Sequence, residues 1–88
     1  MLEFKKSTNS TKKYMVKTPS GRWIHFGARD MQHYKDQTPL QLYKHLNHND
    51  VKRREAYLAR ARGIKDKNGH LTKDNPEKSN YYAIRFLW

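Results

Sequence analysis

The sequence predicts an α+β domain built from one β-hairpin, two central α-helices and an apolar C-terminal segment. The chain has 88 residues, and a second core would leave each half too little apolar surface to offset the entropy of the chain. Strand-forming residues flank a turn signal over residues 12–26, whereas helix caps and helical apolar spacing follow over residues 38–62. We therefore expect a flexible basic arm over residues 1–11 and a single domain over residues 12–88.

The hairpin is expected from two strand-like segments, residues 13–17 and 22–26, which are joined by Thr-Pro-Ser-Gly. Proline presets the backbone angle of the second turn position, and glycine supplies the left-handed residue of a bulged hairpin. If Thr18 faces Arg22, four apolar side chains share one face, because side chains alternate along a strand. These four are Tyr14, Val16, Ile24 and Phe26.

The opposite face of this hairpin would carry Met15, Lys17, Trp23 and His25. Two interpretations of Trp23 remain open. It forms part of a second packed face, or it makes a cation–π pair with Lys17 on the solvent side and offers a stacking surface to a nucleic-acid base.

The first central helix is expected over Thr38–Leu46. Thr38, Pro39 and Gln41 form a capping box with proline in the first turn. The apolar residues of this segment share one arc at helical spacing and should face the core. They are Leu40, Leu42, Tyr43 and Leu46.

Asp50 can cap a second helix that runs from Val51 to about Arg62, just before a glycine. Arg54 falls within the inner arc of this helix, so we expect it to pair with a carboxylate such as that of Asp36 or Asp50. The apolar residues of the inner arc are Val51, Tyr57, Leu58 and Ala61.

The C-terminal segment, residues 81–88, is strongly apolar and allows two structures. Tyr82, Ile84, Phe86 and Trp88 alternate as in a strand. Alternatively, Ser79 caps a short helix that carries apolar residues at helical spacing. In both cases we expect the segment to dock on the apolar face of the hairpin, because the chain is otherwise poor in core residues.

Basic charge is concentrated in two blocks. The chain holds 19 Lys and Arg against 8 Asp and Glu, a net charge of +11. Residues 1–29 carry +6 and residues 51–67 carry +5, whereas residues 30–50 and 68–88 carry −1 and +1. Such a field attracts extended phosphate polyanions.

We therefore expect nucleic acid as the partner, DNA rather than RNA, bound through its phosphates with little sequence preference. Trp23 is the candidate for base stacking. The expected phosphate contacts are Lys12, Lys13, Lys17, Arg22, Lys52, Arg53, Arg60 and Arg62.

Several classes of protein are not expected. The absence of cysteine removes disulfides, thiolate zinc sites and cysteine nucleophiles. No apolar run approaches the roughly 20 residues of a membrane span, and no signal-peptide core follows Met1, so neither a membrane span nor secretion is expected. His45 and His48 are spaced as two ligands on one helical face, but Asn47 should end the helix between them, and we expect no metal.

An enzyme is not expected either. A hairpin followed by a helix is similar in topology to the His-Asn-His nucleases, with His25, Asn47 and His48 as the candidate residues, but this likeness is topological only. The sequence has no paired carboxylates in an apolar setting, no glycine-rich phosphate loop and no serine nucleophile motif. We expect no catalytic residue and no cofactor.

Two motifs and the C-terminal pair resemble a family of small basic proteins of unknown function encoded by nucleocytoplasmic large DNA viruses. The motifs are Ile-His-Phe-Gly at residues 24–27 and His-x-Asp-x-x-Arg-Arg-x-x-Tyr-x-x-Arg at residues 48–60, and Leu87-Trp88 closes the chain. The resemblance covers residues 12–88. It implies a virus-encoded protein located in the virion or at a viral replication site, in the cytoplasm or nucleus of the host cell.

In that setting the leading function is nucleic-acid binding in genome packaging or replication. The alternative is a structural cement protein of the virion, whose basic charge would bind acidic surfaces of other viral structural proteins. Binding to nucleic acid should respond steeply to salt, whereas an assembled protein interface should retain its partner.

Overall fold

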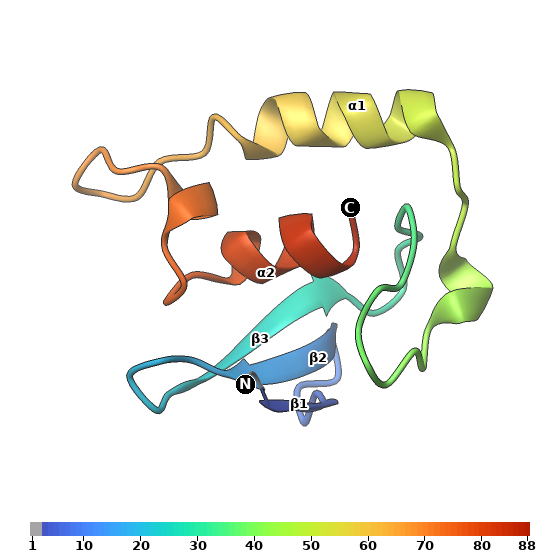
Figure 1. The fold of residues 1–88 in the computed structure, drawn as a ribbon, viewed down its shortest axis with the longest axis horizontal. Coiled ribbons are helices and arrows are strands. Elements are labelled where there is room, and N and C mark those ends of the chain that lie inside the picture. Colours follow the sequence, from blue (N-terminus) through green and yellow to red (C-terminus); the bar gives the residue numbers. More distant parts are fainter. Residues whose placement is uncertain (1–2) are drawn as a thin grey trace.

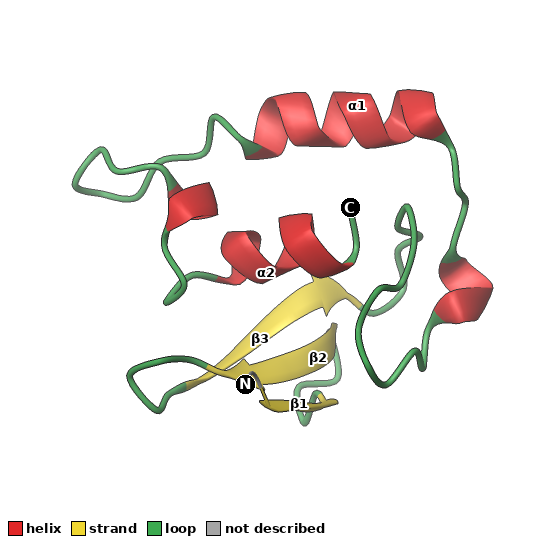
Figure 2. Cartoon of the chain, viewed as in Figure 1, coloured by secondary structure: helices red, strands yellow, loops and turns green. Residues whose placement is uncertain are grey.

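The computed structural model describes residues 3–88, which form a three-stranded antiparallel sheet and two α-helices. The sheet has the order β1-β2-β3, with α2 packed on one face and α1 lying beyond α2 (Figures 1 and 2). An α+β fold is therefore confirmed. The elements are β1 Glu3–Lys6, β2 Lys12–Lys17, β3 Trp23–Ala28, η1 Lys44–Leu46, α1 Val51–Ala61, η2 Thr72–Asp74 and α2 Ser79–Phe86.

The predicted hairpin and its register are confirmed by β2 and β3. Tyr14 pairs with Phe26 and Val16 pairs with Ile24 across the two strands. The N–H of Thr18 donates to the carbonyl of Arg22 at 2.7 Å, and the turn glycine has a φ of +88°. Proline and glycine therefore fixed this turn locally, and the register followed from the apolar residues on one face.

The expected basic arm is a strand over part of its length, which corrects the prediction. Residues 3–6 form β1 and pair with β2, so that Phe4 lies opposite Val16. The Phe4 ring packs edge-on against Phe86, with ring centroids 4.8 Å apart. A four-residue strand with a single packed aromatic residue is too short to produce a recognisable period, which is why the pattern missed it. Residues 1–2 of the expected arm lie outside the described residues.

The first central helix does not form. Only η1 is helical within residues 38–46, and Gln41 has a φ of +48°, which no α-helix tolerates. The carboxylate of Asp36 instead accepts hydrogen bonds from the Thr38 N–H (3.0 Å), the Thr38 hydroxyl (2.6 Å) and the Tyr43 N–H (3.2 Å). A buried carboxylate that binds these backbone groups outweighs the weak local preference for a helix.

Two of the four apolar residues of this segment consequently remain outside the core. Tyr43 is buried, whereas Leu46 is half-buried and Leu40 and Leu42 are exposed. The Tyr43 ring meets Tyr14 edge-on, with centroids 5.3 Å apart.

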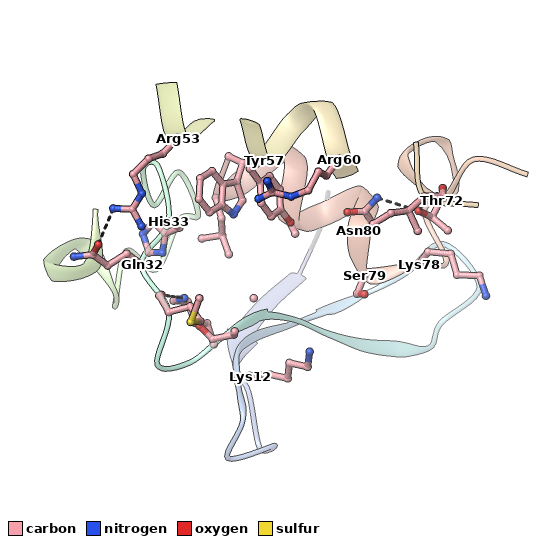
Figure 3. Close-up of a pocket in the computed structure, with 18 of the residues that line it drawn as sticks. Lys12, Gln32, His33, Arg53, Tyr57, Arg60, Thr72, Lys78, Ser79 and Asn80 are labelled. Atoms are coloured by element: carbon pink, nitrogen blue, oxygen red, sulfur yellow. Dashed lines mark hydrogen bonds between the residues drawn. The ribbon is translucent and has the colours of Figure 1, made fainter. Parts of the chain in front are cut away.

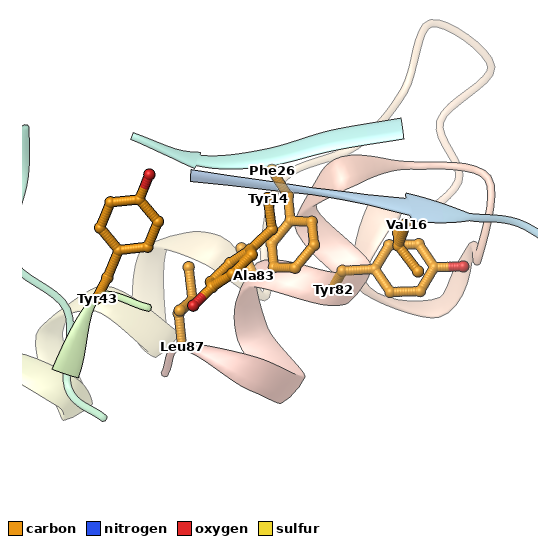
Figure 4. Close-up of a cluster of buried hydrophobic side chains, with 7 residues drawn as sticks. All are labelled: Tyr14, Val16, Phe26, Tyr43, Tyr82, Ala83 and Leu87. Carbon is orange, nitrogen blue, oxygen red and sulfur yellow. The ribbon is translucent and has the colours of Figure 1, made fainter. Parts of the chain in front are cut away.

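The apolar C-terminal segment is a helix, and it docks within the chain. Tyr82, Ala83 and Leu87 are buried against the hairpin residues Tyr14 and Phe26 (Figure 4). The ring of Tyr82 lies 5.9 Å from that of Phe26, and its hydroxyl donates to the carbonyl of Pro76 at 2.6 Å. The core is thus made chiefly of aromatic rings, which compensates for the low apolar content of the chain.

The second predicted helix is confirmed as α1. Asp50 caps it, because its Oδ1 accepts from the N–H groups of Lys52 and Arg53 at 3.0 and 3.2 Å. Leu58 and Ala61 are buried as predicted, but Val51 is 53% exposed because the start of α1 projects beyond the core.

Arg54 has an architectural role, but its expected carboxylate partner is wrong. Its Nε donates to the main-chain oxygen of Trp88 at 2.7 Å, and its guanidinium lies 5.1 Å from the centroid of the Tyr34 ring. The two expected partners already accept other hydrogen bonds, since Asp36 holds the loop and Asp50 caps α1.

Within residues 3–88, no helix combines the length and the apolar character that a membrane crossing needs.

The Asp36 network gives the first prediction. Asp36→Asn replaces an acceptor by an amide that must present N–H groups to existing donors, including the Tyr14 hydroxyl at 2.5 Å. We expect the free energy of unfolding to fall by about 2–3 kcal/mol in urea denaturation. Glu55→Gln, which removes an equal charge from an exposed position on α1, is the control and should cost little. Equal losses in the two variants would contradict the structural role of Asp36.

Candidate nucleic-acid interface

A groove with a cavity volume of about 730 Å³ lies between α1 and the sheet (Figure 3). One wall is α1, the other is formed by the ends of β2 and β3 with the turn that follows, and α2 contributes the part between them. We call this feature the basic groove. Its principal lining residues are Lys12, Ala28, Met31, Gln32, His33, Arg53, Ala56, Tyr57, Arg60, Ile64, Lys78, Asn80, Ala83, Leu87 and Trp88.

The charged residues that line the groove are all basic. Lys12, Arg53, Arg60 and Lys78 line it, and none of its lining residues is acidic. Within residues 3–88 the ion pairs are Lys5–Glu3, Arg22–Glu77 and Lys73–Asp74, so none of these four cations is in an ion pair. The guanidinium of Arg53 donates to Gln32 Oε1 at 2.9 Å, which positions its charge without neutralising it. The arrangement favours an anionic ligand.

Apolar and aromatic groups form the rest of the lining. Tyr57 stacks on Trp88 with ring centroids 4.1 Å apart and an interplanar angle of 9°. Burial raises the pKa of Tyr57, so this ring is neutral at physiological pH. Met31 and Ile64 line the groove although they are 65% and 49% exposed, so the groove carries apolar surface that the fold leaves uncovered.

His33 is a buried residue of the groove. Its Nε2 lies 2.6 Å from Asn47 Oδ1, and that oxygen also accepts from the Asp36 N–H at 2.8 Å. The proton therefore resides on Nε2, which leaves Nδ1 as an acceptor that has no partner among the described residues. Burial lowers the pKa of His33 and keeps the ring neutral.

Lys13 was expected to contact phosphate, but it is a structural residue. Its side chain is 1% exposed, and its ammonium group donates to the carbonyls of Ala28 and Met31. Burial lowers the pKa of Lys13 to about 8, against the attraction of Asp36 and Asp30. The turn after β3 covers this lysine. That turn is distant from Lys13 in the sequence, so the burial of Lys13 could not be inferred from its place in a strand.

Gly27 makes this close packing feasible. It has a φ of +77°, and a β-carbon there would lie 2.6 Å from Leu87 Cδ1 and 3.4 Å from Lys13 Cβ. Only glycine adopts this backbone angle easily and leaves room for the end of the C-terminal segment.

The other predicted contacts lie in three places. Lys12, Arg53 and Arg60 meet in the basic groove. Lys52 on α1 and Arg62 directly after it are exposed and lie outside the groove. Arg22, at the tip of the hairpin, lies 3.9 Å from the carboxylate of Glu77, Lys17 is exposed at the end of β2, and Trp23 is half-buried at the start of β3.

On the outer face of the sheet, Trp23 makes a cation–π contact with Lys5, not with the Lys17 that one of the two interpretations named. The Nζ of Lys5 in β1 lies 5.0 Å from the ring centroid, because β1 adds a strand that the sequence did not reveal. Lys17 is the cross-strand neighbour of Trp23 in the register, as predicted.

Sequence reasoning missed Lys78, Asn80 and Gln32. All three lie in or beside polar connecting segments without any period, so no local signal distinguished them. The side-chain nitrogen of Asn80 donates to the carbonyl of Ala61 and to the Thr72 hydroxyl, both at 2.9 Å, and so joins α2 to the end of α1.

The side chains of the three residues considered for a His-Asn-His nuclease form hydrogen bonds with different residues and not with one another. His25 Nδ1 lies 2.6 Å from the Ser7 hydroxyl, whereas His48 Nδ1 accepts from the Asp50 N–H at 2.9 Å. Asn47 is bound to His33. No group of three His, Asp or Glu side chains in residues 3–88 is placed to hold a metal ion.

Comparison with known proteins places the chain in a family. Residues 2–61 match the model of DUF5754, a family of unknown function. The chain belongs to this family. It matches no curated protein and no solved structure.

The DUF5754 match covers the sheet and α1, and with them Lys12, Arg53 and Arg60 of the basic groove. The match ends before α2, so Lys78 and the stacked Trp88 lie outside the matched region. Two walls of the groove thus come from the DUF5754 region, and the third comes from the remainder of the chain.

The buried Lys13 gives a prediction for stability against pH. Its pKa is about 8 in the folded protein and near the ordinary value of 10.5 in the unfolded chain. Between these values the unfolded chain binds more protons, so stability rises with pH. We expect the free energy of unfolding to rise by about 1–2 kcal/mol between about pH 7.5 and about pH 9.5.

Urea denaturation of the protein beside Lys13→Met tests this, because the variant keeps an apolar stem and removes the titrating group. The rise should be absent from the variant. The range ends before tyrosine titration, which acts in the opposite direction because the pKa of the buried Tyr14 is raised to about 12. A rise of the same size in both proteins would show that Lys13 is not its source.

Proposed function

We propose that this DUF5754 protein binds nucleic acid through the basic groove, with little sequence preference. The observation that carries the proposal is the meeting of Lys12, Arg53, Arg60 and Lys78 in a groove without a carboxylate. These cations come from β2, from α1 and from the segment that precedes α2, so the fold gathers charge that is dispersed in the sequence.

Phosphate contacts explain binding by such a groove better than base recognition does. Lysine and arginine at the edge of a groove fix the path of a nucleic-acid backbone and carry no sequence information of their own. Their attraction comes with the release of counterions, so the affinity depends steeply on salt. DNA, packaged or replicated in a viral setting, is the substrate we propose on the basis of the two motifs described above.

The state of the C-terminal segment supports nucleic-acid binding over a cement role. The cement alternative would gain support if the apolar C-terminal segment were undocked and free to join a neighbouring protein. Here Tyr82, Ala83 and Leu87 of that segment are buried inside the domain, and Trp88 is half-buried and stacked on Tyr57.

The proposal predicts the salt dependence of binding. With four cations at phosphates, log K on duplex DNA should fall with log salt at a slope of about −3 to −4, since each contact contributes roughly −0.9. Fluorescence anisotropy of a labelled duplex across a salt series measures this slope. A slope near zero, or no binding at low salt, would refute the proposal.

A matched pair of variants locates the binding surface. Arg60→Gln should weaken binding and make the slope less steep by about one unit, because one phosphate contact is lost. Arg62→Gln removes the same charge from the same end of α1 but outside the groove, and it should have little effect. Both residues are exposed, so neither variant should change the melting temperature appreciably. Equal weakening by the two variants would place the interface elsewhere.

A further inference from the structure

We infer that the basic groove takes a single strand, with an unpaired base held against its apolar lining and the adjoining phosphates on its cations. This inference rests on the proposed function and specifies its substrate class. It concerns the part of the groove lining that phosphate contacts leave unused.

The first observation is exposed apolar surface inside a strongly basic groove. Met31 and Ile64 line it while 65% and 49% exposed, and Tyr57 presents an aromatic ring there. A phosphate backbone gains nothing from such groups. The flat face of a base does, because it removes apolar surface from water and stacks on aromatic rings.

The second observation is unpartnered hydrogen-bonding capacity. Asn80 gives its side-chain N–H groups to Ala61 and Thr72, which leaves its amide oxygen as an acceptor. Every base carries N–H donors at its edge, so acceptors of this kind suit a base without selecting strongly among sequences.

The size of the groove also supports the binding of a base. A volume of about 730 Å³ lies within the range of sites that enclose a small molecule, and it can admit a base with its sugar. In a duplex the bases remain paired and stacked, so only the phosphates could reach the cations at the opening. Entry of a base therefore requires a single strand, or the cost of removing a base from the stack.

The outer face of the sheet is the competing surface, because Trp23 lies there. However, this ring is half-buried and Lys5 already lies over it at 5.0 Å. A base would have to displace that contact, whereas Met31 and Ile64 in the groove are exposed. We therefore assign the base to the groove.

The test compares three labelled ligands at several salt concentrations by fluorescence anisotropy. They are an oligothymidylate strand, an abasic strand of the same length and charge, and a duplex of the same length. We expect the oligothymidylate to bind about tenfold more tightly than the abasic strand with a similar salt slope, from stacking of a single base. The duplex should bind no more tightly than the oligothymidylate despite its higher charge.

Variants then place the base. Ile64→Gln should lower the affinity for oligothymidylate about fivefold and leave the affinity for the abasic strand unchanged. Val51→Gln is the matched control, since Val51 is an apolar residue of similar exposure, 53%, outside the groove. Melting temperatures of both variants confirm that the fold is intact.

The outcomes separate this inference from the proposed function. Equal, salt-dependent binding of all three ligands would overturn the inference and leave nucleic-acid binding in place. No binding of any ligand at low salt would overturn both. A base preference that survives Ile64→Gln but disappears in Trp23→Ala would move the base to the outer face of the sheet and overturn the assignment to the groove.

Discussion

The buried carboxylate of Asp36 is the interaction on which the rest of the structure depends. Burying an ionised carboxylate is costly unless hydrogen bonds compensate for the lost water. Burial alone would raise the pKa of Asp36, but hydrogen bonds from Thr38, Tyr14 and Tyr43 outweigh it and hold that pKa below its ordinary value. These bonds join β2 to the long connection between the sheet and α1, which has little regular structure of its own.

That connection in turn holds the walls of the basic groove in place. The N–H groups of Lys35 and Gln37 donate to the carbonyls of Leu87 and Phe86, and so bind the end of α2. Trp88, which follows, stacks on Tyr57 of α1. The start of α1 extends past the core, and the helix forms the wall of the groove that Arg53 and Arg60 line (Figures 1 and 3).

Features that depend on neighbouring residues could be predicted from the sequence, whereas features that depend on residues far apart in the chain could not. The hairpin turn at Gly21 and the cap at Asp50 are set by neighbouring residues, and both were predicted. The capping box at Thr38 is also local, but backbone N–H groups of this segment bind Asp36 and the hydroxyl of Tyr14, and Tyr14 lies far away in the sequence. The two basic blocks of the sequence predicted which residues could lie at an interface. They could not show that Lys13 is buried whereas other lysines and arginines line the groove, because the turn that covers Lys13 comes from another segment.

The acidic residues explain why the groove retains its charge. Four of the eight act as hydrogen-bond acceptors for the fold itself: Asp36 in the core, Asp50 at α1, Asp66 in its turn and Glu77 at the hairpin tip. The hydrogen bonds of these four carboxylates hold them at positions outside the groove, whose lining includes no acidic residue. The positive potential there is therefore a consequence of how the chain satisfies its polar groups, and an external anion is the counterion that remains.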